Sequence, residues 1–200
     1  VWIILDITES PFVTGLVAMS AYLPAIIFGV FAGVLVDQHN RMKLMLISNF
    51  SQAVVVAVIP MLLFIDIKIG LIIGILAFLR ASFGSLFPPA INAFLPELFP
   101  QNKLVKINSL IATSGQFAYF LGPVIAGILL NIISVEILFV WDALSFLLAA
   151  IVLMTIHYSD KYKESISGSQ FQKLKSGFNY LKTNRSIGLL IILTIMNNVF

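Results

Sequence analysis

The residues most able to do chemistry are polar groups set inside long apolar stretches. Arg80 lies near the middle of the stretch that begins at Ile69, and Asp142 lies a turn or two inside the stretch 137–156. A charge at the bilayer centre costs at least about 2.5 to 3.5 kcal/mol, so Arg80 needs a polar partner or an aqueous cavity, unless it snorkels or pins two helices. Asp142 could exchange a proton within the membrane or stay solvated at its interface. Gln116, in a further stretch, could line a polar path or hydrogen-bond between helices.

A short loop holds a second set of polar residues, in the order Gly33-Val-Leu-Val-Asp37-Gln-His-Asn40-Arg41-Met-Lys43. Gly33 lets its helix approach a neighbour, and Asp37 sits where that helix leaves the bilayer. Arg41 and Lys43 hold the loop in the cytoplasm. We expect Asn40 to adopt a left-handed turn, because Asn tolerates this conformation best after Gly. The alternative is that these residues act only as topology signals and helix caps.

Small residues recur in the stretch Gly115-Gln-Phe-Ala-Tyr-Phe-Leu-Gly122-Pro123-Val-Ile-Ala126-Gly127. Residues 115, 118, 122 and 126 share one helical face, which gives a smooth surface for close helix contact. Pro123 removes a backbone hydrogen bond and permits a bend. The simpler interpretation is that small residues at this spacing are the ordinary packing surface of membrane helices.

The composition places the helices that carry these residues in a bilayer. Sixty per cent of the residues are hydrophobic and ten per cent are charged, with a mean hydropathy of +1.03. A soluble protein has roughly a quarter charged residues. The net charge of +3 is explained by basic loops, so nucleic acid is not expected as a partner. There is no cysteine, and no zinc-protease motif, phosphate-binding loop or serine nucleophile elbow is present. We therefore expect no enzyme, no cofactor and no metal site.

Five stretches are long enough to cross a bilayer, which takes about 20 residues of helix. They are 12–36, 44–65, 69–87, 107–133 and 137–156. If they alternate across the membrane, ten of the twelve basic residues fall on one side, which the positive-inside rule makes cytoplasmic. Those ten are Arg41, Lys43, Lys103, Lys106, Lys161, Lys163, Lys173, Lys175, Lys182 and Arg185.

The chain divides into three parts. Residues 1–158 form a bundle of membrane helices whose first helix we expect to be truncated. Residues 159–186 turn polar, and Phe171, Leu174, Phe178 and Leu181 recur at helical spacing, which predicts a cytoplasmic linker with an amphipathic helix on the membrane surface. Residues 187–200 read as the start of a seventh membrane helix that is also truncated.

The loop spacing G-x-x-x-D-x-x-N-R-x-K resembles the loop between the second and third helices of the major facilitator superfamily, with Gln38 and Asn40 where the family usually has a basic residue and a glycine. Arg80-Ala-Ser-Phe-Gly84 resembles an element of the fourth helix in proton-coupled antiporters of that superfamily. The segment 115–127 resembles the fifth-helix motif of its exporters. Further similarity to the macrolide-efflux and siderophore-export branch lies in Leu23-Pro24, Phe87-Pro88-Pro89, Leu95-Pro96 and Asn108-Ser109.

This resemblance implies an all-α membrane protein, the amino-terminal six-helix half of a major facilitator fold plus the start of the seventh helix. It also implies proton-coupled efflux of an amphipathic small molecule, such as a drug, macrolide or siderophore, by alternating access across a bacterial plasma membrane. Asp37 and Arg41 would belong to a charge cluster that joins the cytoplasmic helix ends of both halves. The implied partners are the lipid bilayer, the substrate, protons and a carboxy-terminal half of the same protein.

Three alternatives remain open. A lipid or lysolipid flippase could use the same fold. A membrane-embedded enzyme should show clustered histidines or carboxylates at equal depth, and the sequence shows none. A non-transporting sensor or scaffold should carry a soluble signalling domain.

Overall fold

A computed structural model describes residues 5, 9–65 and 70–156. The described part holds six helices: α2 (Pro11–Gln38), α3 (Arg41–Phe64), α4 (Gly70–Gly84), α5 (Phe87–Leu98), α6 (Gln101–Leu130) and α7 (Val135–Thr155). Five helical segments are long and apolar enough to cross a membrane: Pro11–Gly29, Arg41–Phe64, Gly70–Leu98, Gln101–Leu130 and Val135–Thr155. The five predicted spans are therefore confirmed, and the chain is an all-α, multi-pass membrane protein. The predicted interfacial helix in 159–186 and the seventh span in 187–200 lie outside the described residues.

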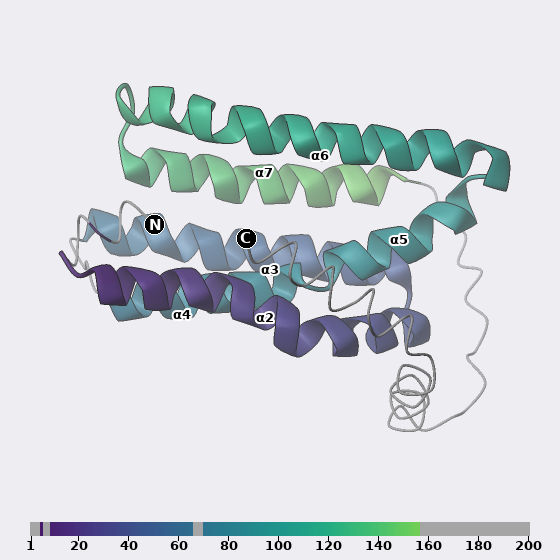
Figure 1. The fold of residues 1–200 in the computed structure, drawn as a ribbon, viewed down its shortest axis with the longest axis horizontal. Coiled ribbons are helices and arrows are strands. Elements are labelled where there is room, and N and C mark those ends of the chain that lie inside the picture. Colours follow the sequence, from purple (N-terminus) through teal and green to yellow (C-terminus); the bar gives the residue numbers. More distant parts are fainter. Residues whose placement is uncertain (1–4, 6–8, 66–69, 157–200) are drawn as a thin grey trace, which may run out of the picture. The chain divides into compact units, whose positions relative to one another are not determined.

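Helix α3 is the centre of the packing. Half of its most apolar window is buried, and it contacts α4, α5 and α7, while α2 lies alongside α4 (Figure 1). A cluster of buried side chains joins α2, α3 and α5 near the α2–α3 loop, and it consists of Val36, Leu44, Met45, Ala90 and Phe94. Many large apolar side chains on the outer faces of the helices are exposed, as expected for surfaces that face lipid. Helix α3 therefore packs against both α4 and α7, which carry Arg80 and Asp142.

Local chemistry explains where the helices begin and end. Ser10 caps α2 by accepting a hydrogen bond from the Val13 N–H at 3.4 Å, with Pro11 at the first helical position. Asn40 caps α3 by accepting one from the Lys43 N–H at 2.9 Å. Asn40 has φ −59° and ψ 117°, so the predicted left-handed turn is wrong. The side-chain cap satisfies the helix end without it.

The stretch 69–87 is the fourth span if the predicted first helix is counted, and the span is longer than the apolar pattern predicted. It was expected to end at Phe87, but α5 continues it to Leu98, and α6 begins at Gln101 instead of near Ile107. The connection between α5 and α6 is short because Pro100 forces the preceding Phe99 into an extended conformation, with φ −124° and ψ 143°. Apolar runs mark the part of a helix inside the bilayer, and these helices extend beyond that part.

Candidate functional site

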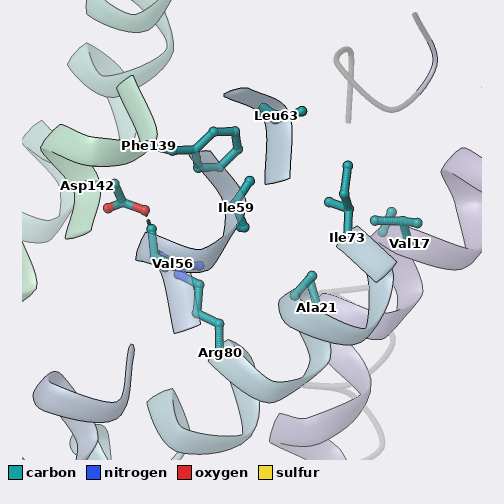
Figure 2. A pocket seen from close by; sticks show the side chains of 11 residues that line it. Val17, Ala21, Val56, Ile59, Leu63, Ile73, Arg80, Phe139 and Asp142 are labelled. Atoms are coloured by element: carbon teal, nitrogen blue, oxygen red, sulfur yellow. Dashed lines mark ion pairs between the residues drawn. The ribbon is translucent and has the colours of Figure 1, made fainter. Parts of the chain in front are cut away.

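Arg80 and Asp142 meet across the bundle. Arg80 projects from α4 about one turn before the helix ends and Asp142 from the first half of α7, and Figure 2 shows the two side chains directed toward each other. Their closest atoms, Arg80 Nη2 and Asp142 Oδ2, are 3.9 Å apart. Both side chains keep more than two fifths of their surface exposed, at 44% and 42%. The sequence predicted that Arg80 needs a polar partner, and the structure places one beside it.

An aromatic ring also supports the arginine. The guanidinium carbon of Arg80 lies 5.3 Å from the ring centroid of Phe146, which is one turn beyond Asp142 on α7. This distance is within the range of a cation–π interaction. Residues 142 and 146 are neighbours on one helical face, because their spacing is four. Helix α7 therefore offers Arg80 a carboxylate and an aromatic ring side by side.

The pair lies on the wall of a cavity of about 250 Å³. The remaining wall is apolar and comes from α2, α3, α4 and α7 (Figure 2). It consists of Val17, Ala18, Ala21, Val56, Ile59, Leu63, Ile73, Ala77 and Phe139. A largely apolar pocket with a few convergent polar groups is the usual form of a small-molecule site.

Both charged groups keep hydrogen-bonding capacity toward this cavity. Within the described residues, neither the Arg80 guanidinium nor the Asp142 carboxylate forms a hydrogen bond. The guanidinium is a permanent cation with five N–H donors in a planar fork, and the carboxylate can accept hydrogen bonds or a proton. The site can therefore bind a polar group of a ligand, exchange a proton, or do both.

The third predicted polar residue is not part of this cavity. Gln116 lies on α6, beside a separate shallow hollow formed with Thr113, Phe117, Phe120 and Leu121 of the same helix. Gln116 is exposed, as are its neighbours along most of α6. The structure thus joins Arg80 to Asp142 and leaves Gln116 apart from them.

The predicted loop motif contains a second ion pair that the sequence did not reveal. Arg41 Nη1 and Glu97 Oε1 are 2.6 Å apart, with only 18% and 20% of their side-chain surfaces exposed. Glu97 lies in the last turn of α5, so this ion pair ties the start of α3 to the end of α5. The only signal in the sequence was its acidic charge on the basic side of the protein.

The other loop residues stay near the surface. Asp37 and Lys43 are exposed, and the His39 ring Nδ1 lies 3.0 Å from the Leu35 carbonyl oxygen. A Cβ atom added to Gly33 would meet no atom within 4 Å in the described structure. The close approach predicted for Gly33 has no counterpart among these contacts. The predicted roles of Asp37 and Lys43 stay predictions.

The small residues of the fifth span also face open space. Helix α6 has no buried residue, and Cβ atoms added to Gly115, Gly122 or Gly127 would meet nothing within 4 Å. Pro123 lies inside this helix, as predicted. The role of the motif in close helix contact therefore stays a prediction.

Comparison with known proteins agrees with this architecture. Residues 1–200 match the family described as Major Facilitator Superfamily. The chain is 24% identical over 189 residues to macrolide efflux protein A of Streptococcus pyogenes, covering 92% of the chain and 46% of the relative. It is 26% identical over 184 residues to the staphyloferrin A transporter of Staphylococcus aureus, covering 90% of the chain and 46% of the relative. A multidrug efflux pump, Tap of Mycolicibacterium fortuitum, is 28% identical over 135 residues, covering 64% of the chain and 33% of the relative.

The chain thus spans about half the length of the curated relatives that it matches most fully. No solved structure matches it significantly.

Proposed function

The chain belongs to the major facilitator superfamily, and on this premise we propose that it forms the amino-terminal half of a secondary active transporter that exports an amphipathic small molecule. In this fold, two halves rock about a site between them near the bilayer midplane. The observation that carries the proposal is the Arg80–Asp142 pair on the wall of an otherwise apolar cavity. A second half of the same protein would supply the rest of the substrate site.

The chemistry of the cavity favours an amphipathic substrate. Nine of its eleven lining residues are apolar and the other two carry opposite charges. Apolar walls bind the body of a ligand, and the charged pair orients a polar group on it. The names of the relatives, which include macrolide efflux, a siderophore transporter and multidrug efflux, support a substrate of this class.

We further propose that the pair couples export to proton entry. Arg80 remains a cation throughout the cycle, whereas Asp142 loses its negative charge when it accepts a proton. A neutral Asp142 no longer attracts the guanidinium, so the arrival of a proton weakens the pair. Because the closest approach is 3.9 Å, with no hydrogen bond, a small movement of α4 or α7 is enough to separate the groups.

The test is efflux by the full-length protein under an imposed pH gradient, with membrane abundance measured for each variant. We expect Arg80→Ala to abolish proton-driven efflux and Arg80→Lys to retain part of it, because Lys keeps the charge but lacks the planar fork. Asp142→Asn should uncouple efflux from the pH gradient, because the amide cannot exchange a proton. Leu148→Ala is a matched control, since Leu148 is 61% exposed on α7 and does not line the cavity.

Wild-type-like proton-driven efflux by an abundant Arg80→Ala protein would reduce Arg80 to a packing residue. Transport of lysolipid, with no efflux of small molecules, would favour the flippase alternative.

A further inference from the structure

The fourth membrane span is interrupted in its middle. Helix α4 ends at Gly84 and α5 begins at Phe87, although both belong to the single span Gly70–Leu98. The cause lies in Pro88 and Pro89, which have no N–H to give to the carbonyls of residues 84 and 85. Leu86 keeps helical angles, φ −76° and ψ −29°, so the span continues after the break. The break is therefore a short turn at residues 85 and 86 within one continuous span.

Helix α3 contacts this break through two buried polar side chains. The Ser48 hydroxyl donates to the Phe83 carbonyl oxygen at 2.8 Å. The Gln52 amide nitrogen donates to the Ser48 hydroxyl oxygen at 3.1 Å and to the Ser48 carbonyl at 3.3 Å. Ser48 is fully buried and Gln52 is 7% exposed. Gln52 thus fixes the Ser48 hydroxyl, which in turn holds the last turn of α4.

Gly84 makes room for this contact. A Cβ atom at position 84 would lie 2.9 Å from Gln52 Oε1, closer than such atoms approach. The nearest atom belongs to the end of a flexible side chain, so a larger residue would displace the Gln52 amide and leave the backbone in place. The displaced amide would lose its hydrogen bonds to Ser48. By contrast, a Cβ atom at Gly15 would meet nothing within 4 Å.

The break separates two ion pairs with different attachments. On its amino-terminal side, Arg80 lies one turn before Gly84 and faces Asp142 at 3.9 Å. On its carboxy-terminal side, Glu97 is bound to Arg41 at 2.6 Å, and α5 contributes to the buried cluster. The polar contact of α5 with α3 is therefore an ion pair, whereas that of the end of α4 with α3 is the neutral hydrogen bond from Ser48.

We propose that Ser48, Gln52 and Gly84 position Arg80 against Asp142, and that α4 moves about the break at residues 84–86 while α5 stays fixed to α3. The consequence for transport rests on the proposed function. A neutral hydrogen bond is weak enough to break and re-form within a transport cycle, unlike the partly buried ion pair of α5. The three residues then set how often Arg80 leaves Asp142.

The experiment measures the position of α4 directly, in the full-length protein with any cysteine outside residues 1–200 replaced. Spin labels at Leu71→Cys on α4 and Leu148→Cys on α7 report the α4–α7 distance. These two positions are 72% and 61% exposed. Labels at Val54→Cys on α3 and Leu148→Cys form the reference pair, because the proposed movement does not involve α3 or α7. Drug efflux is measured on the same variants without labels.

We expect Gly84→Ala and Ser48→Ala each to shift or broaden the α4–α7 distance, to leave the reference distance unchanged, and to lower efflux several-fold. Adding Gln52→Ala to Gly84→Ala should change the α4–α7 distance no further, because the new methyl group has already displaced the amide from Ser48. Adding it to Ser48→Ala should restore nothing, since the bond to Phe83 is still lost. Gly15→Ala is the matched control and should match the wild type.

A wild-type distance in both Gly84→Ala and Ser48→Ala would overturn the proposal, and so would a further, additive change when Gln52→Ala is added to Gly84→Ala. If the distances follow the expected pattern but the unsubstituted protein exports no tested compound, the positioning role stands and the proposed function fails.

Discussion

At the scale of single residues, one prediction concerns Phe146, because its ring contacts the Arg80 guanidinium in addition to Asp142. A cation–π contact contributes about 0.5 to 1 kcal/mol where it is exposed, and more when desolvated. Phe146→Leu should therefore lower proton-driven efflux by roughly two- to fivefold, and Phe146→Tyr should keep most of it. The measurement is initial efflux rate at equal membrane abundance.

The same comparison has a built-in control in Arg80→Ala, which removes the cation itself. Because Arg80→Ala abolishes proton-driven efflux, the readout in that background is the unfolding temperature in detergent, which Phe146→Leu should lower less than it does when Arg80 is present. An equal loss with and without Arg80 would show that the ring acts by packing alone.

At the scale of single residues, the sequence could reveal a charge but not its partner. Arg80 and Asp142 stood out because a charge in an apolar run is costly, whichever way it faces. Phe146 and Gln52 did not stand out in the sequence, because their roles depend on which neighbouring helix each of them contacts. Gln116 was grouped with the coupling residues by its polarity, and the structure places it outside the cavity.

At the scale of elements, the Arg41–Glu97 pair should hold α5 on α3. Its side chains are mostly buried, and the Arg41 Nε atom has no hydrogen-bond partner among the described residues. Removing one partner leaves the other charge poorly solvated. This lowers the free energy of unfolding by about 3 to 5 kcal/mol for a fully buried pair, and by less for this partly exposed pair. We expect Glu97→Gln and Arg41→Ala each to lower the unfolding temperature in detergent, and the double variant to lower it by less than the sum of the two single effects.

Thermal unfolding of the two single variants and the double variant closes a double-mutant cycle. Strictly additive losses would mean that the two charges do not interact. Lys103→Ala is a suitable control, because Lys103 is exposed at the start of α6 and lies outside this pair.

The elements themselves were largely predictable, and their interruptions were not. Apolar length fixed the existence of five spans, since only helices satisfy the backbone in lipid. The apolar pattern did not predict the break at Gly84 or the extension through α5, because it continues across Pro88 and Pro89 without a gap. Asn40 was assigned the wrong backbone conformation, because capping and left-handed turns favour the same residue type.

At the scale of the whole molecule, the distribution of basic residues predicts which ends of the helices are cytoplasmic. We expect His39→Cys, in the α2–α3 loop, to react with an impermeant thiol reagent only after the cells are opened. Ile132→Cys, in the turn between α6 and α7, should react in intact cells, and position 132 is 73% exposed. The natural absence of cysteine in these 200 residues makes the labelling specific.

The two positions serve as controls for each other, since both lie in short connections and differ only in side. Reaction of position 39 from outside intact cells would reverse the orientation of every helix.

The length of α6 has a consequence for how the protein sits in the lipid. Its 30 residues extend about 45 Å, whereas the hydrocarbon layer is about 30 Å thick. If α6 fitted the hydrocarbon layer by tilting alone, its tilt from the bilayer normal would exceed the usual range of about 0 to 40°. We therefore expect the polar first turns to emerge among the lipid headgroups, where Lys103 and Lys106 can bind anionic phosphates. If these two lysines set the depth of the helix, membranes that differ in thickness should change its inclination while that end stays in place.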